Sequence, residues 1–78
     1  MSNKDLYTAI FCESFGINEA DALKLTYQSI DAWDSVGHMS LMALLEEKFE
    51  IEIDIDDIID FSSFEKGIEI LAKYDINI

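Results

Sequence analysis

The 78-residue sequence contains no proline, three glycines and one cysteine. Proline and glycine interrupt regular structure, so their scarcity favours helices over a turn-rich β fold. Cys12 has no second cysteine with which to form an internal disulfide, so nothing in the sequence requires an oxidising compartment. The chain also has no apolar run near the ~20 residues that a membrane span needs. We expect a helical protein without a transmembrane segment.

Basic residues are also scarce. Five Lys and Arg residues stand against seventeen Asp and Glu residues, for a formal net charge of −12. Such a surface repels phosphate backbones, which argues against nucleic-acid binding, and it attracts basic patches on partner proteins. The opening segment "MSNKDLYTAIF" has polar and acidic residues where a secretory signal needs a basic region and an unbroken apolar one. We therefore expect a cytoplasmic protein.

Hydrophobic residues make up 50% of the chain, which is enough for one compact core. The length predicts a single domain over residues 1–78. Apolar residues spaced three and four apart predict a first helix that ends at Gly16, a residue suited to a left-handed C-cap. Residues 18–33 have mixed periodicity and predict a long loop. The apolar anchors expected in that loop are Leu23, Leu25, Tyr27 and Ile30.

A second helix is predicted from Ser35 to Phe49, with Asp34 as its N-cap. Residues 54–60 predict a turn or two of helix. A last helix begins with a capping box formed by Ser62 and Glu65. Its expected buried stripe is Phe64, Ile68 and Leu71, with Ala72 beside them, and Gly67 allows close packing. A strand over residues 49–55 is an alternative, because the pattern there also fits a period of two.

The helix over residues 35–49 carries two apolar stripes when its residues are placed at 100° per step. The core stripe contains Leu41, Met42, Leu45 and Phe49. The second stripe lies roughly opposite and contains Val36, Met39, Ser40 and Ala43, flanked by Glu46 and Glu47. Either the helix is buried on both sides, or the second stripe is an exposed docking surface rimmed by carboxylates.

The sequence offers no self-contained catalytic or metal site. A nucleophilic serine needs a base that a third group orients. His38 is the only histidine, and it falls near the core stripe, which predicts a packed or partly buried side chain. "DIDDII" begins like a calcium loop but has Ile59 where such a loop needs glycine. We therefore expect neither an enzyme nor a metal protein.

The segment "WDSVGHMSLMALLEEKFEIEI" resembles the motif of acyl carrier proteins, in which Asp-Ser opens the second helix. "IFCESFGI" is similar to the end of that family's first helix, and "IDDIIDFSSFEKGIEIL" to its short third helix and capped fourth. The resemblance implies an all-α four-helix bundle of the acyl-carrier type, with a long loop between helices one and two and a short third helix. A monomer is expected.

The resemblance also implies a function. A separate phosphopantetheinyl transferase would load Ser35 with 4′-phosphopantetheine from coenzyme A, and Asp34 would be the flanking residue of the motif. The thiol of this cofactor would carry acyl intermediates as thioesters between enzymes of a fatty-acid, polyketide or specialised pathway. Acyl-activating or acyl-transferring enzymes with basic docking patches would be its other partners. The residues implied in partner binding are Val36, Met39, Ser40, Ala43, Glu46 and Glu47.

Two alternatives stay open at this point. Ser35 is followed by Val-Gly-His-Met, whereas fatty-acid carriers typically continue with Leu and an acidic residue, so the segment is more similar to discrete carriers of specialised pathways. An aminoacyl or peptidyl carrier is the alternative within the family. The chain could also be an unmodified acidic helical adaptor that only binds partner proteins.

Overall fold

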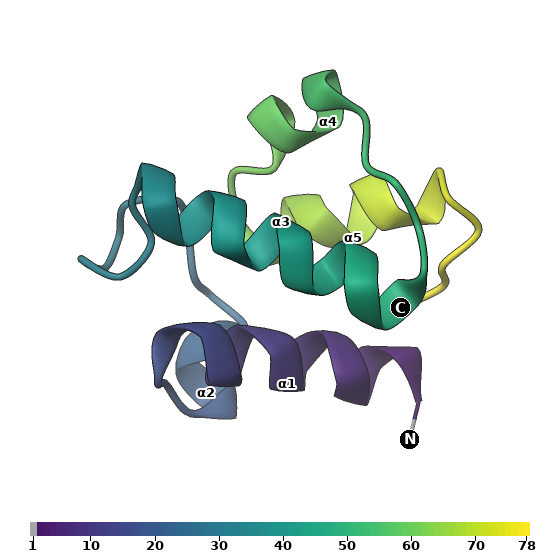
Figure 1. Ribbon diagram of the computed structural model, residues 1–78. Helices are drawn as coiled ribbons and strands as arrows, with labels where there is room; N and C mark the ends of the chain where they lie inside the picture. Colours follow the sequence, from purple (N-terminus) through teal and green to yellow (C-terminus); the bar gives the residue numbers. More distant parts are fainter. Residues whose placement is uncertain (1) are drawn as a thin grey trace.

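The computed structural model describes residues 2–78, and Met1, which the single-domain prediction includes, lies outside the described residues. The described helices are α1 (Asn3–Phe15), α2 (Glu19–Ala22), α3 (Ser35–Phe49), α4 (Ile55–Asp60) and α5 (Phe64–Ala72). No strand forms within residues 2–78, so the all-helical prediction is confirmed and the alternative strand over residues 49–55 is wrong. Helices α1 and α3 pack together, and α4 lies on the far side of α3 from α1 (Figure 1).

The boundaries of the first two long helices follow from their caps. Ser2 accepts a hydrogen bond from the Asp5 amide and starts α1, and Gly16 ends it at φ 64°, as predicted. Asp34 caps α3, whose predicted bounds are confirmed. At the other end of α3, Glu50 adopts the left-handed conformation with φ 55°, so the chain turns away there and no strand continues from it.

The predicted loop over residues 18–33 contains a one-turn helix. Asn18 caps α2 by accepting a hydrogen bond from the Asp21 amide at 2.9 Å, a local signal that the loop prediction overlooked. Leu25 is buried as expected, and Tyr27 and Ile30 are partly buried. Leu23 is 45% exposed, so the prediction that it anchors the loop is wrong.

The start of α5 differs by one residue from the prediction. Ser63, not Ser62, caps the helix by accepting a hydrogen bond from the Lys66 amide at 2.9 Å. The carbonyl of Ser62 instead accepts from the Tyr27 amide at 2.8 Å, which ties the loop to the α4–α5 connection. The buried stripe shifts accordingly: Ile68 is only partly buried and Ala72 is exposed. The buried residues of α5 are Phe64, Gly67, Ile70 and Leu71.

Aromatic side chains fill the space between α1, α5 and the segments around Trp33 and Phe61. The buried rings are Tyr7, Phe11, Phe15, Trp33, Phe61 and Phe64. The Tyr7 hydroxyl donates to the Phe64 carbonyl at 2.7 Å, and burial raises the pKa of Tyr7. Gly67 allows this packing, as predicted, because a Cβ there would lie 2.1 Å from the Tyr7 hydroxyl.

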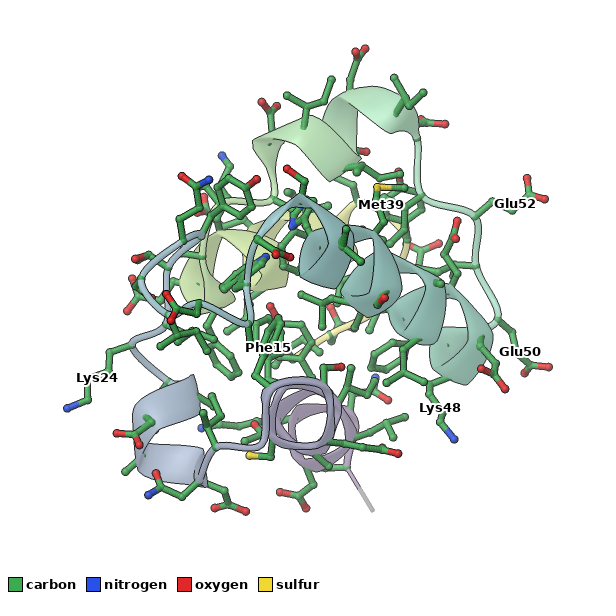
Figure 2. All side chains as sticks on the ribbon, turned by 60° about the vertical axis from the view of Figure 1, so that its left-hand side comes forward. Phe15, Lys24, Met39, Lys48, Glu50 and Glu52 are labelled. Carbon is green, nitrogen blue, oxygen red and sulfur yellow. The ribbon has the colours of Figure 1, made fainter. Side chains whose placement is uncertain are left out.

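Helix α3 contributes Leu41, Met42 and Leu45 to this core, each at most 1% exposed. Phe49, which the sequence places with them, is only partly buried because it lies in the last turn. Figure 2 shows Phe15 pointing inward between α1 and α3, and Met39 on the side of α3 that faces α4. The charged ends of Lys24, Lys48, Glu50 and Glu52 point outward in the same view.

Candidate functional site

Ser35 is the first residue of α3, and its side chain is exposed. The preceding Asp34 has an extended backbone, and its Oδ1 accepts a hydrogen bond from the Gly37 amide at 2.8 Å. A carboxylate at this position is stabilised both by the free amide groups and by the helix dipole. The dipeptide Asp34-Ser35 therefore sets the start of the helix and places a hydroxyl at its exposed end.

The two ring nitrogens of His38 are both hydrogen-bonded within the protein. Trp33 donates its indole N–H to Nδ1 at 2.8 Å, and Nε2 lies 2.7 Å from the Ile58 carbonyl oxygen. An indole nitrogen can only donate, so Nδ1 is the acceptor and Nε2 carries the proton that it donates to Ile58. His38 is half-buried, as the sequence predicts, and it is not positioned as a base for Ser35.

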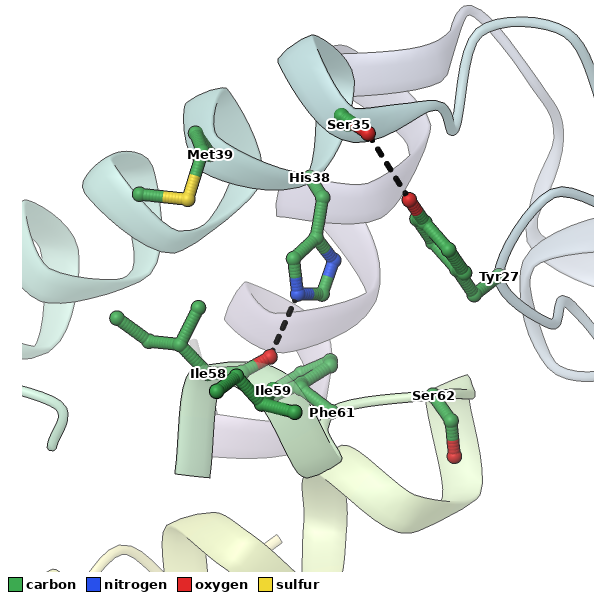
Figure 3. Close-up of a pocket in the computed structure, with 8 residues that line it drawn as sticks. All are labelled: Tyr27, Ser35, His38, Met39, Ile58, Ile59, Phe61 and Ser62. Atoms are coloured by element: carbon green, nitrogen blue, oxygen red, sulfur yellow. Dashed lines mark hydrogen bonds between the residues drawn. The ribbon is translucent and has the colours of Figure 1, made fainter. Parts of the chain in front are cut away.

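The Ser35 hydroxyl instead contacts Tyr27. The two side-chain oxygens lie 3.3 Å apart, and either can donate (Figure 3). The sequence predicts Tyr27 only as an anchor of the loop. Its contact with Ser35, eight positions along the chain, depends on the path of the loop between them. No pattern in the sequence signals this contact.

An apolar groove runs from Ser35 between α3 and α4, with a volume of about 370 Å³. Tyr27 and Ser35 lie at one end, and the side chains of Met39, Ile58 and Ile59 lie along it (Figure 3). His38 closes its inner side, because the ring reaches across to the Ile58 carbonyl. Phe61 and Ser62 complete the lining. The groove is therefore an apolar surface hollow that begins at the exposed hydroxyl of Ser35.

The second apolar stripe of α3 is exposed, with Val36 75% and Met39 55% accessible. Ser40 and Ala43 of the same stripe are exposed as well. Two isoleucines of α4 extend this surface across the groove, since Ile55 is 73% and Ile59 74% exposed. The sequence does not predict the contribution of α4, because its six residues, "IDDIID", are too few to define an apolar face.

The two glutamates beside the stripe differ in their surroundings. Glu47 is exposed, whereas Glu46 is partly buried and its Oε2 accepts a hydrogen bond from the Ile53 amide at 2.9 Å. Glu46 therefore fixes the segment that follows α3. Its charge lies at the edge of the stripe, but its carboxylate is already engaged in the fold.

A polar cluster holds α4 against the end of α5. The buried Asp57 carboxylate accepts hydrogen bonds from the Lys73 ammonium and from the Tyr74 hydroxyl. The Tyr74 hydroxyl also accepts from the Asp54 amide at 2.9 Å. Hydrogen bonds from Lys73 and Tyr74 hold the pKa of Asp57 below its usual range, and the same contact with Asp57 raises the pKa of Lys73.

Within residues 2–78, His, Cys, Asp and Glu side chains nowhere gather in groups of three that could hold a metal ion. None of the helices described in this range is both long enough and apolar enough to cross a membrane. No protein-family model matches the chain, and the search of curated proteins finds no significant match.

Proposed function

We propose that this protein is an acyl carrier whose Ser35 is loaded with 4′-phosphopantetheine. The observation that carries the proposal is an exposed serine hydroxyl at the first residue of α3, directly after the capping Asp34 and at one end of an apolar groove. The single histidine is engaged elsewhere, so the serine is suited to receive a group from another enzyme and not to start a reaction of its own.

In the chemical step of loading, this chain would supply the attacking hydroxyl. The Ser35 oxygen attacks the phosphorus of coenzyme A that bears the pantetheine group. The phosphoanhydride bond breaks, adenosine 3′,5′-bisphosphate leaves, and the serine proton passes to a base of the transferase. The transferase would supply Mg²⁺, which would stabilise the developing charge on the phosphate oxygens.

The residues around Ser35 fit the proposed group. A phosphodiester on Ser35 would lie in solvent, and the apolar side chains of Met39, Ile58 and Ile59 fit the aliphatic parts of a bound arm. When attached, the group would supply a thiol that holds acyl cargo as a thioester. His38 would keep the inner side of the groove closed through its hydrogen bond to Ile58.

The exposed apolar surface of α3 suits transient docking of the enzymes that load and use the carrier. Val36, Met39 and Ala43 would enter a groove of the partner, and Ser40 would lie among them. Glu47, and to a smaller extent Glu46, would attract a basic patch. A net charge of −12 supports encounter with basic enzymes, including the transferase and acyl-transferring enzymes.

The proposed fold type follows the same assignment. Helices α1, α3, α4 and α5 would correspond to the four helices of the acyl-carrier bundle, and α2 would be a turn within its long first loop. The protein would act as a monomer in the cytoplasm. An aminoacyl or peptidyl cargo is a variant of this proposal that leaves the loading site unchanged.

The test is intact mass after incubation with coenzyme A, Mg²⁺ and a broad-specificity phosphopantetheinyl transferase. We expect the wild-type chain to gain one phosphopantetheine group and Ser35→Ala to gain none. Ser14→Ala, which removes a hydroxyl from α1, is the matched control and should load like the wild type. If Ser35→Ala gains the group, Ser35 is not the attachment site. If neither the wild type nor Ser14→Ala gains it, the proposed carrier function is wrong.

The unmodified adaptor is the second candidate, because the exposed isoleucines of α4 enlarge the apolar surface beyond α3. This candidate predicts that the wild-type chain gains no mass under the same conditions. It also predicts that Ser35→Ala binds its partner proteins as tightly as the wild type does.

A further inference from the structure

Tyr27 is the side chain that hydrogen-bonds to Ser35 in the described structure, with 3.3 Å between the two oxygens. Ordinary O–H···O bonds are about 2.7–2.8 Å long, so this contact is a weak one. A weak bond can bias the direction of the serine hydroxyl without removing it from reaction. The contact therefore suits a residue that orients Ser35 and does not block it.

The Tyr27 side chain is held in place by several contacts. Its amide donates to the Ser62 carbonyl at 2.8 Å, which fixes the backbone to the α4–α5 connection. Its ring meets Trp33 edge-on with centroids 6.1 Å apart, and His38 with centroids 5.3 Å apart. Trp33 and His38 are hydrogen-bonded to each other, so they form a firm support for the Tyr27 ring. The ring in turn holds the hydroxyl beside Ser35.

We propose that Tyr27 is a positioning residue for Ser35, an inference that rests on the proposed function. Before loading, its hydroxyl holds the Ser35 hydroxyl at the end of the α3–α4 groove. After loading, it donates a hydrogen bond to a non-bridging oxygen of the phosphodiester, which keeps the attached arm at the entrance of that groove.

The change of partner after loading follows from the chemistry of the ester. Once the ester bond forms, Ser35 Oγ has lost its proton, and the negative charge resides on the non-bridging phosphate oxygens. Hydrogen bonds to such charged oxygens are shorter and roughly twice as strong as neutral ones. The Asp34 carboxylate, which caps the helix next to Ser35, repels the phosphate, so the uncharged Tyr27 hydroxyl is the favourable neighbour.

Tyr27→Phe tests the proposal because it keeps the ring against Trp33 and His38 and removes only the hydroxyl. Tyr74→Phe is the matched control, since its hydroxyl contacts Asp57 and Asp54 and not Ser35. In loading assays with coenzyme A and transferase, Tyr27→Phe should lower kcat about two- to tenfold, the range expected for one neutral hydrogen bond, with KM for the carrier unchanged. Tyr74→Phe should load like the wild type.

Phosphorus NMR of the loaded proteins measures the surroundings of the phosphodiester, which would not change if Tyr27 served only the stability of the fold. The phosphodiester resonance of Tyr27→Phe should shift from the wild-type position toward that of the loaded chain unfolded in urea. Tyr74→Phe should keep the wild-type resonance even if its stability falls. The unfolding midpoints of all three proteins show that each remains folded under the conditions of the assay.

The outcomes separate this inference from the function on which it rests. If the wild type gains no mass, the proposed function fails and the role of Tyr27 fails with it. If the wild type loads and Tyr27→Phe matches it in both kcat and phosphorus resonance, the function stands and the positioning role is overturned. A loss that appears equally in Tyr74→Phe also overturns it.

Discussion

Met39 and Met42 lie three residues apart on α3, and their side chains are 55% and 1% exposed. The same contrast holds for the whole helix: Leu41 and Leu45 are fully buried, whereas Val36 is 75% exposed. The interpretation in which α3 is buried on both sides is therefore wrong. Apolar residues that the fold does not cover contribute little to its stability, so their hydrophobic surface remains available for contact with another protein.

The largest effect should come from the buried face. Leu45→Ala should lower the free energy of unfolding by about 2–5 kcal/mol, because it leaves a cavity among fully buried side chains. Urea denaturation followed by the fluorescence of the buried Trp33 measures this loss. A decrease below about 1 kcal/mol would show that the site is not part of a tightly packed core.

The polar cluster that holds α4 should make stability depend on pH. Asp57 has a pKa below its unfolded value, so its contacts with Lys73 and Tyr74 stabilise the fold above the ordinary pKa of an aspartate. This contribution is lost as the pH falls through the folded-state pKa of Asp57. Asp57→Asn should therefore be less stable than the wild type near neutral pH, and the difference should shrink at acid pH.

Thermal unfolding of the two proteins from neutral to acid pH measures this dependence. Asp56→Asn is the control, because it makes the same change at an exposed position of α4. A stability difference between the wild type and Asp57→Asn that stays constant over the whole pH range would contradict the role assigned to the cluster.

The sequence predicts most of the helical framework because the relevant signals are local. Asp34 and Gly16 lie at the ends of periodic segments and fix those ends locally, Asp34 through its side-chain oxygen and Gly16 through its left-handed backbone. Ser62 and Ser63 are adjacent and equally able to cap α5, and the choice between them depends on the bond from Tyr27 to the Ser62 carbonyl. The prediction was wrong there because a distant residue decides the outcome.

The candidate site also has features that the sequence predicts and features that it does not. The sequence predicts the end position of Ser35 on its helix and the direction of Met39, since both follow from the cap and the helical period. It does not predict the contact of Tyr27 with Ser35 or the groove beside α4, because both depend on how the loop and α4 pack. It also treats Glu46 and Glu47 alike, although only Glu46 has a carboxylate bound to the backbone of Ile53.

Glu47→Lys should lower the association rate with the transferase by reversing a charge beside the apolar stripe, with a deficit that shrinks as salt is added. Glu69→Lys, an equal charge change at an exposed position of α5, is the control. Stopped-flow measurements at two ionic strengths compare the two variants. Equal deficits in both would mean that net charge matters and that the position of Glu47 does not.

The smallest expected change in stability tests the central claim, that the outward face of α3 serves partner docking. Met39→Ala should lower the free energy of unfolding by less than about 1 kcal/mol, whereas the buried Met42→Ala should lose about 2–5 kcal/mol. The decisive measurement is the dissociation rate of the transferase complex with Met39→Ala. We predict faster dissociation at a nearly unchanged association rate, because the loss of a contact in an interface usually changes the dissociation rate. If the Met39→Ala protein is fully folded and the transferase dissociates from it at the wild-type rate, the claim is contradicted.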